Sequence, residues 1–172
     1  MIKFCFIFLL LFIPGVGFAQ TKSIPAWFIN SFKNNKLSIK YQLDAYAKPA
    51  FLKADFNGDG IKDIAALIIE RKTRKKGIVI MHGTTNPYFV FGAGVQFGNG
   101  GDNFKWMTGW KLYTKKVAYE TQVNKNGDLI DPKKVKMKRS AVYVYKTEDL
   151  YPNSGGLIYW DGKKYIWIQQ GE

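Results

Sequence analysis

The stretch from Asp55 to Asp63 holds the side chains of this sequence best suited to chemistry. Carboxylate or amide oxygens stand at its first, third, fifth and ninth positions, and a glycine follows the fifth: Asp55, Asn57, Asp59, Gly60 and Asp63. A hard cation such as Ca²⁺ takes about six to eight oxygen ligands. With the backbone carbonyl of Ile61 as a further ligand, the stretch predicts a calcium loop between two strands.

The same residues allow two alternatives to such a loop. Asn-Gly-Asp-Gly also suits a turn that binds no metal, but that explanation leaves Asp55 and Asp63 at matching offsets unexplained. An EF-hand is rejected because Ala66 stands where that motif needs a bidentate Glu, and because strands are predicted on both sides.

The segments Ala54 to Gly60 and Asp63 to Ala65 resemble the calcium loops of the FG-GAP/VCBS family, known from integrin-type β-propeller blades. The resemblance implies that Asp55, Asn57, Asp59, Ile61 (through its carbonyl) and Asp63 are the Ca²⁺ ligands, with binding weakened by Asn57. The stretch 155–165 is similar to the closing hairpin of small exported bacterial proteins that carry one acidic loop. A propeller needs several blades, so we expect a single compact sheet with the loop embedded in it.

Other catalytic arrangements are poorly supported. His82 is the only histidine, and we expect it at the surface or packed rather than acting as a base. The single cysteine, Cys5, lies in the N-terminal apolar run, so zinc sites of the His/Cys type are excluded by count. Carboxylates outside the loop stand in no recognisable catalytic context. We therefore expect no enzymatic activity.

The N-terminal segment has the layout of a secretory signal peptide. Lys3 precedes the apolar run Phe4 to Ile13, and Gly17-Phe18-Ala19 offers small residues for cleavage. The run is too short to span a membrane, which takes about 20 residues. We expect residues 1–19 to be removed, residues 20–172 to form one β-rich domain, and the protein to be periplasmic or secreted.

The charge of the chain points to acidic partners. Its net charge is +13, or +12 without Lys3, and a field of this sign favours anionic glycan, lipid head groups or nucleic acid. An exported protein meets little nucleic acid, so that class is disfavoured. The alternative to an acidic partner is a basic surface that is only solvated and keeps the protein soluble. The candidate binding residues are Trp106 and Trp110 of the glycine-aromatic segment and Lys134, Lys136 and Lys138; the aromatics suit either sugar stacking or core packing.

Hydrophobic patterning supplies the elements that would position these residues. A helix is expected over Ser23 to Asn35, with Pro25 at its start, and a glycine-aromatic loop over Gly92 to Gly109, with a helical turn near Phe104. Two hairpins are expected at Asn126-Gly127 and Asp161-Gly162, and Asp131-Pro132 should begin a turn before the basic run 133–139. The expected strands are Leu37 to Ala47, Phe51 to Ala54, Ile64 to Ile69, Ile78 to Met81, Tyr88 to Phe91, Lys111 to Val123, Leu129-Ile130, Ala141 to Tyr145, Leu157 to Trp160 and Tyr165 to Gln169.

These features predict an α+β fold, mostly antiparallel β-sheet with a short N-terminal helix, in which a propeller-blade-like meander carries the acidic loop. The first functional hypothesis is an exported, calcium-stabilised, non-catalytic module that binds anionic glycan or an envelope surface. The second is an inhibitor or immunity-type protein that blocks a secreted enzyme through the glycine-aromatic loop. The third is an enzyme of unrecognised type.

Overall fold

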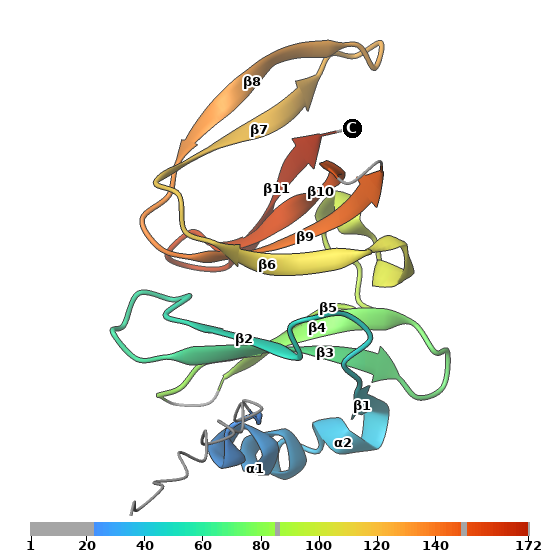
Figure 1. Ribbon diagram of the computed structural model, residues 1–172, viewed down its shortest axis with the longest axis vertical. Coiled ribbons are helices and arrows are strands. Elements are labelled where there is room, and N and C mark those ends of the chain that lie inside the picture. Colours follow the sequence, from blue (N-terminus) through green and yellow to red (C-terminus); the bar gives the residue numbers. More distant parts are fainter. Residues whose placement is uncertain (1–22, 85–86, 149–150, 172) are drawn as a thin grey trace, which may run out of the picture.

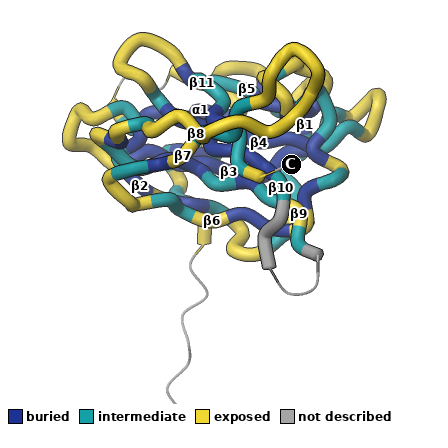
Figure 2. The backbone as a smooth tube through the Cα atoms, turned by 90° about the horizontal axis from the view of Figure 1, so that it is seen from above, coloured by how far each residue is buried: buried dark blue, intermediate teal, exposed yellow. Residues whose placement is uncertain are grey.

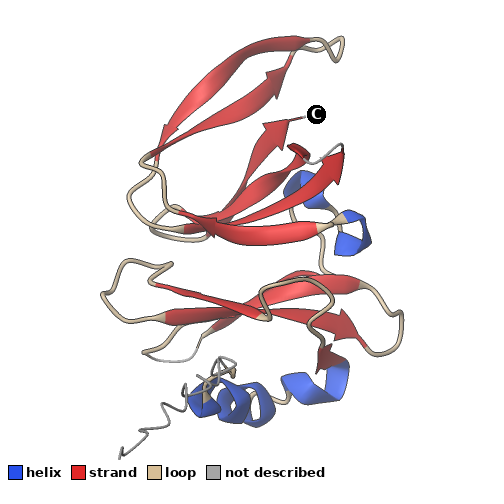
Figure 3. Ribbon diagram, viewed as in Figure 1, coloured by secondary structure: helices blue, strands red, loops and turns tan. Residues whose placement is uncertain are grey.

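The computed structural model describes residues 23–84, 87–148 and 151–171 and arranges them in layers (Figure 1). Two antiparallel sheets face each other, short helices cover the outer side of one, and a hairpin lies beyond the other (Figure 3). The signal peptide predicted over residues 1–19 falls outside the described residues. The predicted α+β class, mostly antiparallel with a short N-terminal helix, is confirmed.

The first sheet contains the predicted meander. β2 (Phe51–Ala54), β3 (Asp63–Glu70), β4 (Lys76–Met81) and β5 (Tyr88–Gly92) follow one another in space as in sequence. β1 (Tyr41–Leu43) pairs with the other half of β3. The acidic stretch joins β2 to β3, so its placement between two strands is confirmed.

Strand β3 is buried on both faces, as its unbroken apolar sequence predicts. Ile64 and Ile68 point to the helices and pack with Phe28. Leu67, whose side chain alternates with theirs, points to the second sheet. The central strand of the first sheet thus contributes to two apolar clusters at once.

The N-terminal segment differs in part from prediction. Helix α1 (Ala26–Asn34) follows Pro25 and buries Phe28 and Phe32 against the first sheet. The strand predicted over Leu37 to Ala47 is wrong at its start, because Leu37–Lys40 forms the short helix α2 and only Tyr41–Leu43 is strand. Lys36, in a left-handed conformation (φ 58°), turns the chain between the two helices.

The second sheet has the order β11 (Tyr165–Gly171), β10 (Tyr151–Trp160), β9 (Ala141–Glu148) and β6 (Gly109–Tyr113). Both of its consecutive pairs, β9–β10 and β10–β11, are antiparallel, and β6 returns beside β9. The expected single sheet is therefore wrong. Apolar residues on one face of each sheet need a partner layer, and the two sheets cover each other.

The segment predicted as one strand over Lys111 to Val123 is divided between two sheets. Its first part continues β6, and its second part is β7 (Val117–Val123), which among the described strands pairs with β8 (Leu129–Lys136) alone. The turn at Asn126-Gly127 is confirmed, with Gly127 at φ 91°. The turn expected at Asp131-Pro132 is wrong, because β8 runs through it. Figure 2 shows β8 exposed along its course.

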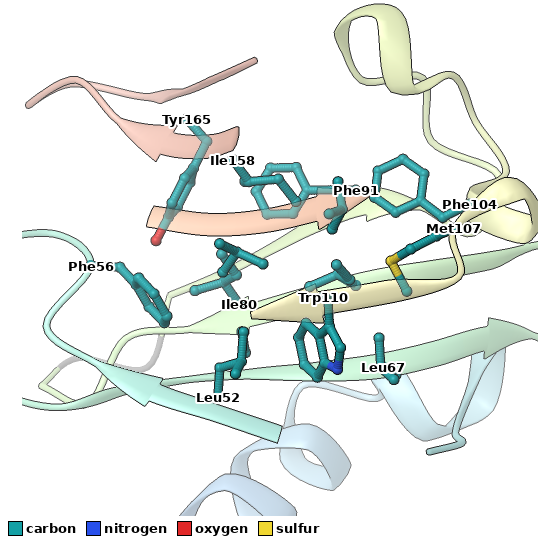
Figure 4. Packing of buried hydrophobic residues seen from close by; sticks show 14 of the residues in the cluster. Leu52, Phe56, Leu67, Ile80, Phe91, Phe104, Met107, Trp110, Ile158 and Tyr165 are labelled. Atoms are coloured by element: carbon teal, nitrogen blue, oxygen red, sulfur yellow. The ribbon is translucent and has the colours of Figure 1, made fainter. Parts of the chain in front are cut away.

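The largest apolar cluster fills the space between the two sheets (Figure 4). Leu52, Ile80 and Phe91 of the first sheet meet Trp110 and Ile158 of the second. The glycine-aromatic segment closes one end of this core with two single 3₁₀ turns, Gly98–Gly100 and Phe104–Trp106, so the predicted turn near Phe104 is confirmed. Phe104 itself is fully buried.

Candidate functional site

The acidic loop is folded by hydrogen bonds from its own backbone to its carboxylates. Asp55 accepts from the amide of Gly58 through Oδ1 (2.6 Å) and from that of Gly60 through Oδ2 (2.9 Å). Both glycines have left-handed backbones, with φ 85° and 87°, a region that costs other residues free energy. The loop therefore closes around Asp55 because glycine stands at both bends.

Asp63 joins this loop to the end of β4. Its Oδ2 accepts from the amides of Phe56 (2.7 Å) and Asn57 (3.3 Å), and its Oδ1 accepts from the amide of Gly83 (3.0 Å). Its side chain is fully buried. Burial raises the pKa of the Asp63 carboxyl above its ordinary value, while the amide donors and His82 act in the opposite direction.

Asp59 lies at the exposed side of the loop. Its Oδ1 accepts from the amide of Ile61 (2.8 Å), and its Oδ2 accepts from the Asn57 side-chain amide (2.9 Å) and the Thr84 hydroxyl (2.5 Å). The Thr84 hydroxyl, followed by the other donors, holds the pKa of Asp59 below its ordinary value. Asp59 is thus an ionised group at the surface of the loop.

The donor set of the loop suits a hard cation, because the side chains of Asp55, Asn57, Asp59 and Asp63 offer oxygen ligands. In the described part of the chain, however, no three His, Cys, Asp or Glu side chains lie together as a ready metal-binding group. Both oxygens of Asp63 accept backbone hydrogen bonds, and Ile61 lies at the surface as a residue that is 45% exposed. Calcium binding by the five predicted residues therefore stays a prediction.

His82 connects the acidic loop to the second sheet. Its Nδ1 lies 3.3 Å from the Asn57 side-chain amide and its Nε2 lies 2.8 Å from the Tyr165 hydroxyl. The ring packs edge-on against Trp160, with centroids 5.4 Å apart. Burial lowers the pKa of His82, so the neutral ring is favoured. The sequence left His82 either at the surface or packed, and the structure shows it packed. Its contact with the acidic loop was not indicated by the sequence.

A polar cavity of about 310 Å³ adjoins the acidic loop. Three segments of chain meet there: the loop itself, residues 114–116 before β7, and residues 137–140 before β9. Asp55 and Gly58 line it on the loop side. Five cationic side chains also line it: Lys62, Lys115, Lys116, Lys138 and Arg139. We call this the cationic cavity.

A second cavity, of about 270 Å³, lies beside the glycine-aromatic segment. Trp106 and Trp167 line it with their ring centroids 6.4 Å apart and nearly perpendicular, at 82°. Asn99 and Gln169 also line this tryptophan cavity. The sequence pointed to Trp106. Trp167 was missed because it lies in β11, whose sequence is that of an ordinary half-buried strand and does not mark a binding residue.

The other predicted binding residues do not gather in one place. Trp110 is 1% exposed in the core, where its Nε1 donates to the carbonyl of Pro49 (2.9 Å). Lys134 and Lys136 are exposed on β8, and Lys138 lines the cationic cavity. The structure thus separates these residues among the core, the hairpin and the two cavities.

Comparisons of the chain with protein-family models, with curated proteins and with solved structures found no significant match. Within the described residues, none of the helices has the length and apolar character needed to cross a membrane. The site must therefore be interpreted from its own geometry.

Proposed function

We propose that this protein is an exported, non-catalytic module that binds anionic glycan and whose acidic loop is stabilised by calcium. The observation that carries the proposal is the tryptophan cavity. Sugar-binding pockets need apolar ring faces together with a few fixed polar groups, and Trp106, Trp167, Asn99 and Gln169 supply both kinds at this cavity.

The hydrogen bonds of the two indoles support this assignment. Trp106 Nε1 donates to the carbonyl of Gly100 (3.0 Å), and Trp167 Nε1 donates to Gln169 Oε1 (2.8 Å). Both ring N–H groups are thus satisfied within the protein, and both rings are held in place. A rigid aromatic surface loses little conformational entropy when a ligand stacks on it.

The charge of the protein favours acidic polymers over neutral ones. Arginine and lysine exceed aspartate and glutamate by 13 in the full sequence. Such a field raises the encounter rate with polyanions and weakens as salt is added. The absence of catalysis is proposed because the single histidine is 4% exposed and both of its ring nitrogens face partners, Asn57 and Tyr165.

Glycan binding is tested by titrating the purified protein with dextran sulfate and with neutral dextran over a salt series. Dextran sulfate should bind, with an affinity that falls as salt rises. Trp106→Ala should weaken binding about fivefold, the value of one lost aromatic contact. Trp27→Ala, on α1 at the far side of the first sheet, is the matched control. The proposal fails if neither polymer binds or if the two variants behave alike.

Calcium binding is tested by thermal unfolding in millimolar calcium and in EDTA. An ion that binds only the folded state at about a hundred times its Kd adds about 2.7 kcal/mol, which raises Tm by about 5–10 °C for a domain of this size. Asp59→Asn should abolish the shift. Asp161→Asn, an exposed carboxylate in the turn before β11, should retain it. Equal melting temperatures in calcium and EDTA would refute calcium stabilisation.

A second candidate function, inhibition of a secreted enzyme, is favoured by the β7–β8 hairpin rather than by the glycine-aromatic loop. Four large apolar side chains on this hairpin are more than half exposed: Tyr119 57%, Val123 59%, Leu129 54% and Ile130 51%. Val123 and Leu129 are paired directly across the hairpin, and contiguous exposed apolar side chains are typical of protein interfaces. Tight capture of one protein, with little dependence on salt and lost in Ile130→Ser, would favour this function.

A further inference from the structure

We propose that the cationic cavity is a built site for one phosphate or sulfate monoester group. The inference rests on the proposed function for the identity of the ligand as a glycan, but not for the presence of the site. It assigns the charge recognition to one cavity, where the sequence suggested a broad basic surface.

The lining of the cavity is strongly unbalanced in charge. Five cations face it against a single carboxylate, Asp55. The three ion pairs among the described residues use other lysines, namely Lys40, Lys75 and Lys133. The positive charge at the cavity is therefore not neutralised by ion pairs on the same protein, and an anion entering it would gain several attractive contacts.

Arg139 is the best-positioned of these cations. Its Nη1 donates to the carbonyl of Trp160 (3.0 Å), which fixes the guanidinium. Its Nε is buried and has no hydrogen-bond partner. This nitrogen is closed to solvent and lies against Gly58, so Arg139 would attract an anion through the charge of its fixed guanidinium and not through Nε.

The backbone around the cavity is held before any ligand arrives. The amide of Met137 donates to the carbonyl of Lys116 (2.8 Å), which ties two of the three lining segments together. The amide of Lys138 donates to the Tyr159 hydroxyl (3.1 Å). The third segment is fitted closely, because a Cβ at Gly58 would lie 2.8 Å from Arg139 Nε. Such preorganisation lowers the entropic cost of binding.

The chemistry of the lining indicates the ligand. Lysine ammonium groups act as point charges toward phosphate, and an arginine fork can donate two parallel hydrogen bonds to oxyanions. Thr114 and Ser140 add hydroxyl donors. A tetrahedral group with three terminal oxygens, charged −1 in a sulfate monoester and near −2 in a phosphate monoester, satisfies more of these donors than a carboxylate does.

The site is tested on the full chain in EDTA, so that calcium plays no part. Titration with inorganic phosphate and inorganic sulfate is compared with chloride at equal ionic strength. Lys115→Gln and Lys138→Gln should each weaken phosphate binding about fivefold, the upper range of one partly exposed charge contact. Lys134→Gln, on the exposed face of β8, is the matched control and should leave binding unchanged. Arg139 is left unchanged because its guanidinium also donates to the carbonyl of Trp160, so replacing it could disturb the fold as well as the cavity.

The outcomes separate this inference from the proposed function. Equal losses in Lys115→Gln and Lys134→Gln, or no binding beyond that of chloride, would overturn the cavity as a site. Glycan binding that persists with wild-type affinity in Lys115→Gln and Lys138→Gln would overturn the assignment of glycan charge recognition to this cavity, while leaving the proposed function intact. Phosphate binding at the cavity without any affinity for dextran sulfate would support the site and refute glycan as the ligand.

Discussion

Replacing Asp63 by Asn tests whether this carboxylate holds the acidic loop to the fold independently of any ion. The side chain keeps its shape, but one of its two acceptor oxygens becomes an NH₂ group. Either the amide of Phe56, at 2.7 Å, or that of Gly83, at 3.0 Å, then faces a donor instead of an acceptor. The site is fully buried, so water cannot replace the lost partner.

The magnitude follows from the two shorter of the three hydrogen bonds that Asp63 accepts. A hydrogen bond to a charged group contributes about 1.5–3 kcal/mol, and the bond that remains is weakened to the value of a neutral pair, about 1 kcal/mol. Part of this loss is offset because a neutral amide is less costly to bury than a carboxylate. We expect Asp63→Asn to lower the free energy of unfolding by about 2–3 kcal/mol, a large share of the stability of a typical domain.

The assay is urea unfolding in EDTA, followed by far-ultraviolet circular dichroism. With an m-value of about 1–3 kcal/mol per molar urea, the midpoint should fall by about 1 M. Asp59→Asn, on the exposed side of the same loop, should lower the midpoint in EDTA much less, because its hydrogen bonds compete with water. If Asp63→Asn unfolds at the wild-type midpoint in EDTA and loses stability only relative to the calcium-bound protein, the structural role assigned to Asp63 is wrong.

Two further predictions concern the core and the tryptophan cavity. Burial raises the pKa of Tyr46, whose hydroxyl donates to the carbonyl of Gly77 (2.9 Å). A raised folded-state pKa gives stability that is complete below the unfolded value of 10.0 and is lost as pH rises above it. Tyr46→Phe should therefore flatten the alkaline loss of stability in urea unfolding while costing about 1 kcal/mol at neutral pH; an unchanged alkaline profile would contradict this. Gly156→Ala places a Cβ 2.2 Å from the Trp167 ring, so it should lower Tm and weaken dextran sulfate binding; a wild-type Tm would contradict that packing.

Sequence patterning located most strands because their burial is one-sided or complete. Phe51–Ala54 matches its strand, and the apolar run from Ile64 lies inside β3 with one residue added at either end. The two hairpins were found through Asn126-Gly127 and Asp161-Gly162, where turn chemistry is local. Features decided within a few residues were thus accessible from the sequence.

Features decided by long-range packing were not accessible. Leu37, Ile39, Tyr41 and Leu43 alternate as in a strand, yet the first part is helical because Leu37 packs against Phe32 and Phe28 in one cluster. The division of residues 111–123 between β6 and the hairpin depends on β9 arriving later in the chain. No pattern within the segment records that partner.

The same distinction applies to the site. The loop from Asp55 to Asp63 was recognised because its spacing is local. The cationic cavity was missed because Lys62, Lys115 and Arg139 lie far apart in the sequence and meet only in the fold. Lys138 was included in a basic run, but nothing in that run distinguished it from Lys134 on the exposed strand.

The contact between His82 and Trp160 places a natural fluorophore next to a residue that contacts the acidic loop. His82 lies beside the indole of Trp160 on one side and within hydrogen-bonding distance of Asn57 on the other. A rearrangement of Asn57 would shift the imidazole and change the surroundings of the indole. The fluorescence emission of Trp160 should consequently follow events at the acidic loop without any added label, and Trp160→Phe identifies its share of the signal.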